Sequence, residues 1–548
     1  MNQSEFQEVH LLNLQDEIFL HIFSYVNISW RENVAQVCKQ YCPQICNEEI
    51  RRSIVNSSRE FEDLTIDLND DELMETKHVE DVILKFGKRI KRFELKDFDL
   101  SESKLRRIFD CIPNVENLVL NSCRSSACSS VYLKSITKPN ADISEPNLCK
   151  LKKLTIGGWS IPDMSDILLN TLLNAIPKDS IKELIIDIPE VFDMVWQEFL
   201  NQQTSIKMLE ISTHEYNNRV KFDHLKLEHL TLGRYFDEED VSIILQQQPG
   251  LLYFESIAYR TLTGNNFFTA LCELNNLEVT ILSVNLDMPY PVFQSLKYLT
   301  HLKKLELKSK QGEESNNLLE LSRMQLNIEK LIISYGEKIP PEFFIQMSQN
   351  FRKLKHIKLR NRYTNIINTI LENFPNLESI AIEFEYCVDD VDVLVIDENL
   401  RHEKLVEMIM NGRSVNGDNT RALLSLLNVC PNVERIMLAM DDEFYNEDLQ
   451  QIINDHPKLT HLKIVNEDLK TKIILEDETI DCIRTAASRL KFIELYGFLV
   501  SPKSSLKTLF KDEFNYFRCY DEERNEYIEC HLIMKKRNVP DWDFYWDL

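Results

Sequence analysis

The sequence is poor in glycine, with 11 glycines among its 548 residues. It contains no Gly-x-Gly-x-x-Gly, Gly-x4-Gly-Lys or Gly-x-Ser-x-Gly motif. The loops that cradle phosphates or expose a catalytic serine are therefore missing. Acidic pairs are plentiful, but none lies in a recognisable acid–base setting. We expect no catalytic residue, no cofactor and no enzymatic activity.

Positively charged residues are fewer than negatively charged ones. The sequence has 63 Lys and Arg residues and 88 Asp and Glu residues, which gives a formal net charge of −25. A chain this acidic is a poor generic ligand for DNA, RNA or an anionic membrane. No run approaches the roughly 18 apolar residues that a membrane helix requires. We therefore expect neither a nucleic acid nor a membrane as partner.

The sequence lacks a secretion signal and a regular cysteine pattern. Its first ten residues are polar and contain no basic region leading into an apolar one, so no signal peptide is expected. The 13 cysteines are odd in number and irregularly spaced. This fits a reducing compartment better than a disulfide scaffold, and we expect the cytoplasm, the nucleus or both.

Two patterns could suggest a metal site. Cys38, Cys42 and Cys46 form C-x3-C-x3-C, but the common cluster motifs use other gaps and Pro43 interrupts the helix that would align them. The pairs His224/His229 and His456/His461 are not His-Glu-x-x-His, and no cysteine pair lies nearby. We favour buried thiols and a positional effect of the repeat over metal ligation, and predict no metal site.

The dominant feature that is present is an internal repeat. The unit reads apolar, two variable residues, then apolar–x–apolar, as in Leu302-KKLEL and Ile328-EKLII. Earlier copies are expected near Leu64 and Phe93. Most steps between units fall within the 20–29-residue period of leucine-rich repeats. The fourth position of the unit falls at Leu118, Leu154, Leu184, Leu209, Leu230, Phe254, roughly Val279, Leu305, Leu331, Ile357, Ile380, Val406, Ile436, Leu462 and Ile493.

Each unit predicts one strand and one helix. The apolar–x–apolar triplet alternates with period 2, as a half-buried strand does. Between triplets, apolar residues recur at helical spacing, as at Phe343, Phe344, Met347 and Phe351. Prolines such as Pro375 stop these helices just before the next strand. Because one unit cannot bury its own faces, the units should stack into a curved α/β solenoid with a strand-lined concave face.

This body resembles the long-helix leucine-rich repeats that often accompany F-box domains, and the resemblance covers roughly residues 61–496. We expect a tail at 1–12, a three-helix module at 13–56 and a solenoid of about 15–17 repeats at 57–500. Insertions are expected near 121–147 and 383–398. The aromatic and charged segment 501–548 is interpreted as a cap, because an open solenoid end exposes core.

Residues 13–56 carry helix signals of their own. Asn13 can cap a helix whose first turn holds Asp16 and Glu17. Ser29-Trp-Arg-Glu32 is a capping box for a second helix, and Pro43 starts a third. So many apolar residues on about 45 positions suggest that a partner, the first repeats, or both cover this module.

The order Leu14-Gln15-Asp16-Glu17-Ile18, Ile22-Phe-Ser-Tyr-Val26, then Val37-Cys38-Lys39 and Tyr41 resembles an F-box. The departure is Gln15, where the family usually has proline. The resemblance implies docking on the Skp-type adaptor of a cullin–RING (SCF) ubiquitin ligase, while the solenoid holds a protein substrate. The alternative is a repeat scaffold without a ligase role, whose first helices only cap the solenoid. The implied adaptor-binding residues are Leu14, Gln15, Glu17, Ile18, Val37, Cys38 and Tyr41.

The variable positions of the later strands should point onto the concave face. In this acidic chain they are predominantly basic, which predicts a cationic stripe for an acidic or phosphorylated substrate segment. The alternative is that these lysines are merely solvated. The predicted substrate-binding residues are Lys304, Lys308, Lys330, His356, Lys358, Arg360, Arg435, His461, Lys463 and Tyr496.

Overall fold

The computed structural model divides the chain into two units, Met1–Pro189 and Glu190–Leu548, which are described separately. The predicted F-box-like module at 13–56 lies outside the described residues, as do 126–147, 385–395 and most of 501–548. The structure describes residues 63–67, 83, 87–125, 148–158, 166–187, 193–212, 221–233, 236–256, 265–283, 293–308, 316–334, 339–361, 366–384, 396–397, 399–412, 419–440, 444–466, 473–500, 516–518 and 528–535.

The first unit is built on parallel strands, each paired with the next repeat's strand. Leu64, Phe93 and Leu118 lie in register, which confirms the two early copies of the repeat. Its main strands are β1 (Asp63–Asp67), β2 (Arg92–Lys96), β4 (Asn117–Asn121), β6 (Lys153–Gly157) and β7 (Glu183–Asp187). The short β3 (Asp99–Leu100) and β5 (Arg124–Ser125) pair with each other, and the helices are η3 (Gly87–Arg89), α5 (Glu102–Cys111) and α6 (Asp166–Asn174).

The second unit continues the pattern with twelve parallel strands, from β8 to β18 and then β20. They are β8 (Met208–Ser212), β9 (His229–Leu232), β10 (Tyr253–Ser256), β11 (Val279–Ser283), β12 (Lys304–Lys308), β13 (Lys330–Ser334), β14 (His356–Asn361), β15 (Ser379–Phe384), β16 (Glu407–Gly412), β17 (Arg435–Met440), β18 (His461–Asn466) and β20 (Phe492–Val500).

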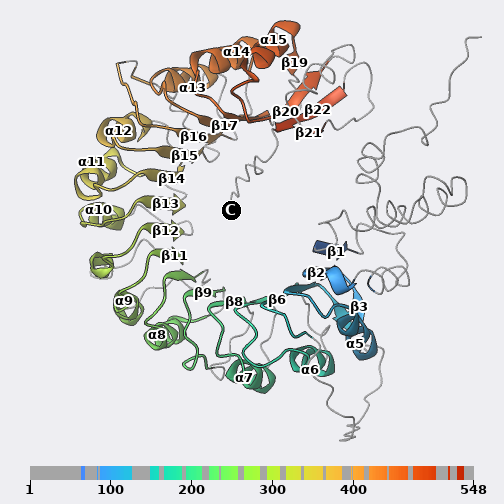
Figure 1. Ribbon diagram of the computed structural model, residues 1–548. Coiled ribbons are helices and arrows are strands. Elements are labelled where there is room, and N and C mark those ends of the chain that lie inside the picture. The colour runs from blue at the N-terminus through green and yellow to red at the C-terminus, as the bar shows by residue number, and fades with distance from the viewer. Residues whose placement is uncertain are drawn as a thin grey trace, which may run out of the picture. The chain divides into compact units, whose positions relative to one another are not determined.

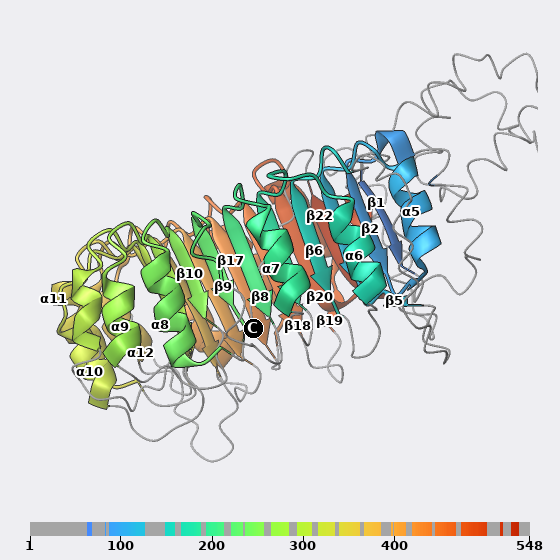
Figure 2. The same ribbon diagram turned by 90° about the horizontal axis from the view of Figure 1, so that it is seen from below.

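The helices of the second unit all lie on the outer side of its strands (Figures 1 and 2). A 3-10 helix, η4, takes the place of an α-helix between β11 and β12. The elements are α7 (Asp193–Asn201), α8 (Glu238–Gln247), α9 (Asn265–Cys272), η4 (Phe293–Tyr298), α10 (Asn316–Ser322), α11 (Pro341–Asn350), α12 (Ile366–Asn373), α13 (Asn419–Asn428), α14 (Asn446–Asp455) and α15 (Asp477–Ala486).

The core lies between strands and helices. Leu305 and Leu307 are fully buried on β12, and α11 buries Phe343, Phe344 and Met347 against the same layer. Alternate strand residues and one stripe of each helix thus form one apolar layer. Its burial stabilises the fold by roughly 25 cal/mol per Å² of apolar surface removed from water. The predicted α/β solenoid is confirmed.

Strand register corrects two repeat positions. The core column runs Phe254, Thr280, Leu305 and, later in the unit, Ile380, Met408, Ile436. The sequence pattern instead predicted Val279 and Val406 in this column. Both predictions were wrong, because an apolar residue was expected in the core position, which the polar Thr280 (0% exposed) occupies in one repeat and Met408, two residues after Val406, occupies in the other.

Polar side chains form hydrogen bonds with backbone carbonyls of the preceding repeat. His224 and His402 bond the carbonyl oxygens of Leu200 and Phe374, both through Nε2 at 2.9 Å. The Leu200 carbonyl lies in the last turn of α7 and the Phe374 carbonyl directly after α12, and each also accepts a backbone N–H from the following turn. Three other side chains also bond a carbonyl oxygen of the preceding repeat: Gln248 to Phe222 at 2.8 Å, Asn350 to Ser322 at 2.8 Å and His456 to Leu427 at 3.1 Å.

The sheet changes direction at its end. β20 pairs antiparallel with β22 (Ile528–Lys535), which also pairs antiparallel with β21 (Tyr516–Arg518), and the short β19 (Ile473–Leu475) pairs parallel with β20. That 501–548 caps the solenoid stays a prediction. Among the described helices, none has the length and apolar character needed to cross a membrane.

Candidate protein-binding face

The side chains of β8–β18 and β20 that point away from the helices form what we call the inner face. On β12, Leu305 and Leu307 point to the core, so Lys304, Glu306 and Lys308 belong to the inner face. Register places these side chains in rows that run from strand to strand about 4.8 Å apart. All ten predicted substrate-binding residues lie on this face, but their role in binding stays a prediction.

Positive charge on the inner face is concentrated on β12–β14. Five cations lie there against one carboxylate, Glu306, which gives a formal charge of +4 with histidine neutral. We call these five residues the cationic cluster: Lys304, Lys308, Lys330, Lys358 and Arg360.

Acidic side chains partly neutralise one edge of the cationic cluster. The Glu306 carboxylate lies 3.0 Å from the ammonium nitrogen of Lys304 and 3.5 Å from that of Lys308. Lys308 also lies 3.5 Å from Glu255 of β10. The cations on β12 are therefore already paired within the fold.

Lys330 and His356 differ from the paired cations. They face each other in register on β13 and β14, and neither side chain has a hydrogen-bond or ion-pair partner within the described part of the chain. Burial and then the nearby ammonium of Lys304 lower the pKa of Lys330. Burial and then Lys330 lower the pKa of His356. Lys330 therefore carries an ammonium with no ion-pair partner among the described residues, beside an imidazole that can donate an N–H, so this pair is a favourable place for an anion.

The inner face of β15–β20 does not continue the cationic stripe. Arg435 lies 3.1 Å from Glu407, and Lys463 lies 3.0 Å from Glu494. With Glu383, three carboxylates face two cations there. The predicted stripe rested on the basic residues alone and left out the carboxylates of Glu383, Glu407 and Glu494 between them. Since strand neighbours lie far apart in sequence, only register shows that these charges pair.

An apolar row lies where the charges give way. Ala381, Ile409 and Met437 are in register on β15, β16 and β17. They lie on the inner face, yet their exposed fractions are only 7%, 8% and 3%. This apolar row was not predicted from the sequence, although each of the three strands carries an apolar residue in the middle of its apolar–x–apolar triplet.

Aromatic contacts mark both ends of the second unit's inner face. The ring of His229 stacks on Tyr253 with centroids 5.5 Å apart, and His461 stacks on Phe492 at 6.3 Å. Burial, followed by the charges of Arg435 and Lys491, lowers the pKa of His461 to about 4. The histidines once considered as metal pairs thus contact strand neighbours or helix-end carbonyls. Tyr496 is 40% exposed on β20.

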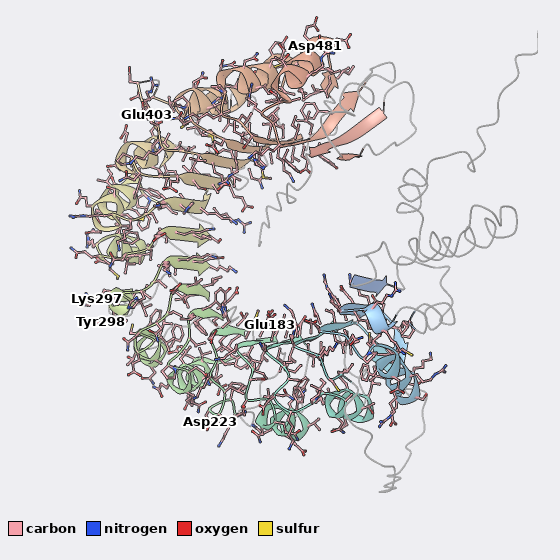
Figure 3. All side chains as sticks on the ribbon, viewed as in Figure 1. Glu183, Asp223, Lys297, Tyr298, Glu403 and Asp481 are labelled. Atoms are coloured by element: carbon pink, nitrogen blue, oxygen red, sulfur yellow. The ribbon has the colours of Figure 1, made fainter. Side chains whose placement is uncertain are left out.

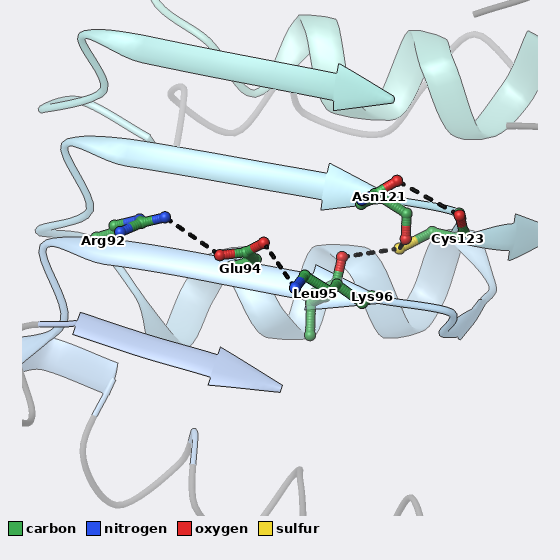
Figure 4. Close-up of polar contacts among 7 residues, drawn as sticks. Arg92, Glu94, Leu95, Lys96, Asn121 and Cys123 are labelled. Atoms are coloured by element: carbon green, nitrogen blue, oxygen red, sulfur yellow. Dashed lines mark hydrogen bonds and ion pairs between the residues drawn. The ribbon is translucent and has the colours of Figure 1, made fainter. Parts of the chain in front are cut away.

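The strands of the first unit carry paired charges. Glu94 lies 3.3 Å from Arg92 and 3.5 Å from Lys96, all on β2 (Figure 4). The Cys123 thiol donates to the carbonyl oxygen of Leu95 at 3.6 Å in the same view. Lys153 and Glu183 pair at 2.9 Å between β6 and β7. These charges are compensated by their neighbours, and exposed pairs of this kind contribute little to stability.

The outer side of the second unit is polar and mixed in charge. Lys297 lies over the ring of Tyr298, 5.0 Å from its centroid, and both project from η4 on that side (Figure 3). Single exposed aromatic or aliphatic residues are normal on such a surface. We therefore find the better candidate on the inner face.

No family model matches the sequence, and no curated protein matches it. Solved structures do. The TLR13 chain of the TLR13–ssRNA13 complex is 15% identical, with a TM-score of 0.41 over 80% of this chain and 54% of that one. The chain thus spans about half the length of TLR13.

Two bacterial structures are also similar. The internalin inlF of Listeria monocytogenes is 15% identical, with a TM-score of 0.32 over 60% of this chain and 89% of that one. The leucine-rich-repeat protein LegL7 of Legionella pneumophila is 14% identical, with a TM-score of 0.31 over 57% of this chain and 89% of that one. The repeated strand and helix described above form a leucine-rich-repeat fold, which presents an extended inner surface for binding.

Proposed function

We propose that this protein is the substrate-recognition subunit of an SCF-type ubiquitin ligase. Residues 13–56 would dock the Skp-type adaptor, and the inner face of the solenoid would bind a protein substrate. The protein performs no catalysis of its own, and other subunits carry out ubiquitin transfer. The F-box-like residues support the first half of this proposal. The cationic cluster on a repeat-built inner face supports the second.

The observation that carries substrate binding is the charge contrast. A formal charge of +4 on β12–β14 stands out in a chain of net charge −25. Such a patch steers an acidic partner and excludes basic ones. Lys330 and His356 face each other in register on neighbouring strands, so one carboxylate or phosphate group can accept hydrogen bonds from both and neutralise the Lys330 ammonium. The substrate segment is therefore acidic or phosphorylated.

Charge reversal tests the substrate half. The double variant Lys330→Glu/Lys358→Glu of the full chain should capture at least tenfold less acidic partner protein by crosslinking. Quantitative mass spectrometry measures the captured amount. Lys353→Glu, an exposed lysine that precedes β14, makes the same type of charge change outside the inner face and should leave capture unchanged. Equal capture by all three proteins would refute the cationic cluster as a binding site.

Co-precipitation tests the adaptor half. Ile18→Asp should abolish capture of a Skp-type adaptor, because it places a charge on the implied adaptor surface, whereas Ser4→Asp in the tail should not. If the unaltered chain captures no adaptor, the ligase role is wrong. The alternative, a leucine-rich-repeat protein-binding scaffold without a ligase role, then stands, and Gln15 is the residue that favours it.

A further inference from the structure

The apolar row is closed to solvent on the side that the helices do not cover. Helices pack against the opposite side of the strands, where Met408 and Met410 are buried. Ala381, Ile409 and Met437 point the other way, yet none exceeds 8% exposure in the full chain. Apolar side chains on a side of a sheet that no helix covers are kept from water when another apolar group lies against them.

Lysines bound the apolar row at both ends. In register, Lys358 of β14 precedes Ala381, and Lys463 of β18 follows Met437. These two lysines are four strand spacings apart, about 19 Å. Lys463 already pairs with Glu494 at 3.0 Å, so the stronger positive end is the cationic cluster. A fitting ligand has apolar side chains in its middle and acidic ones near its ends.

The segment 538–548 of this chain, NVPDWDFYWDL, has that composition. Trp542, Phe544 and Trp546 occupy every second position, separated by Asp543 and Tyr545, so an extended segment places these three aromatic side chains on one side. Asp541 and Asp547 are six residues apart, about 20 Å when extended, which matches the separation of the bounding lysines.

The segment can also reach the apolar row. β22 ends at Lys535, which is in register with Phe492 of β20. Six strand spacings, about 29 Å, separate β22 from β14. Residues 536–547 span about 40 Å when extended, so the segment covers the distance with slack.

We infer that residues 541–548 occupy the apolar row of the same chain. The aromatic side chains lie on Ala381, Ile409 and Met437, and the aspartates meet the longer cationic side chains beside the row. This inference rests on the proposed binding role of the inner face. A substrate that uses this part of the face must displace the segment, which makes the segment an internal competitor.

The test uses the full chain and a labelled peptide of residues 538–548. The full-chain variant Trp542→Ala/Phe544→Ala/Trp546→Ala, which we call the vacated chain, should leave the apolar row unoccupied. Fluorescence anisotropy should then show at least tenfold tighter peptide binding to the vacated chain than to the unaltered chain. The reason is that a tethered segment competes at an effective concentration of roughly millimolar order. A peptide carrying the same three alanines should bind at least tenfold more weakly to the vacated chain.

Matched changes locate the site. In the vacated chain, Ile409→Asp and, separately, Lys358→Glu should each weaken peptide binding at least fivefold, and Lys353→Glu should leave it unchanged. Lys358→Glu alters a partly exposed residue and keeps the test valid if Ile409→Asp disturbs folding, which circular dichroism reports. If the vacated chain with Lys358→Glu binds the peptide as tightly as the vacated chain without it, the assigned site is wrong.

Other outcomes overturn the inference. Equal peptide binding by the unaltered and vacated chains would mean that the row receives a segment from another protein. Binding by neither would mean that the segment has no affinity for the row. Loss of a concentration-dependent dimer in the vacated chain, measured by sedimentation, would assign the segment to a second copy. None of these results alters adaptor capture, so they are distinguishable from failure of the proposed function.

Discussion

The Nε2 atom of His456 lies 3.1 Å from the carbonyl oxygen of Leu427, one repeat earlier, and its Nδ1 atom lies 2.9 Å from the carbonyl oxygen of Ile452. The imidazole is 2% exposed. An imidazole with one N–H donates to one of these carbonyls, so His456→Ala removes that hydrogen bond and opens a cavity, and we expect a loss of about 2–4 kcal/mol.

Because repeat proteins open locally, this loss should appear as faster hydrogen exchange in α13 and α14, measured by mass spectrometry. His301→Ala, at an exposed histidine, should change stability by less than about 0.5 kcal/mol. Unchanged exchange in His456→Ala would show that the bond contributes nothing.

The stability of the second unit should fall as the pH is lowered and His461 becomes protonated. Its pKa is about 4 in the folded chain, because of burial and the charges of Arg435 and Lys491, against about 6.5 in an unfolded chain. The unfolded state binds the proton first, so stability is full above pH 6.5 and is lost as pH falls toward 4. Allowing for solvent screening of a half-exposed ring, the loss is about 1–2 kcal/mol.

Denaturation of His461→Gln and the unaltered chain at pH 7 and pH 4 checks this pH dependence. The variant should lose less stability between the two pH values, and the difference isolates His461 from other acid-sensitive groups. His229→Gln occupies the equivalent strand position in β9 and serves as the matched variant. An identical pH dependence in His461→Gln and the unaltered chain would contradict the assigned titration.

Removing Lys330 should raise the pKa of His356. Burial is the main cause that lowers this pKa, and the adjacent Lys330 ammonium is the second. Lys330→Met removes the second cause and keeps an apolar stem of similar length. The pH dependence of carbethoxylation of His356, followed by mass spectrometry, should shift to higher pH. Lys353→Met should not shift it, and no shift in either variant would mean that the two side chains are not coupled.

Thiol labelling should separate the described cysteines by burial. Burial raises the pKa of Cys123 and of Cys430 to about 12, whereas Cys149 is exposed. At pH 8, iodoacetamide should alkylate Cys149 at least about a hundredfold faster than the other two, because the thiolate is the reactive form. Denaturant should abolish the difference. Fast labelling of Cys430 in the native chain would mean that its repeat opens readily.

Much of the fold was predictable because a repeat reports its own structure many times. The spacing of Leu305, Leu331 and Ile357 predicted parallel strands one above another, and the stripe of Phe343, Phe344 and Met347 predicted a helix. The strand register was predicted less well in the repeats that match the pattern weakly. Around Thr280 and Met408 the apolar pattern is ambiguous by one or two positions, and backbone pairing, not local preference, chose the register.

The candidate site was predictable only in part. Alternation placed Lys330, His356 and Lys358 on the inner face. It could not pair Lys308 with Glu255, because those residues are 53 positions apart and meet only after the strands stack. Nor could it set Ala381, Ile409 and Met437 side by side. The residues predicted to bind an adaptor, Leu14 to Tyr41, lie outside the described residues, so their role remains a prediction.

The sequence by itself determined the periodic unit, the face of each strand and helix that is apolar, and the positions available for binding. These are local properties, set by the 2.0 and 3.6 periods of strand and helix. Tertiary structure alone decided which charges neutralise one another, where the cationic cluster ends and where the apolar row begins. The physical reason is that these relationships run across the strands, between residues that only the stacking of repeats brings about 4.8 Å apart.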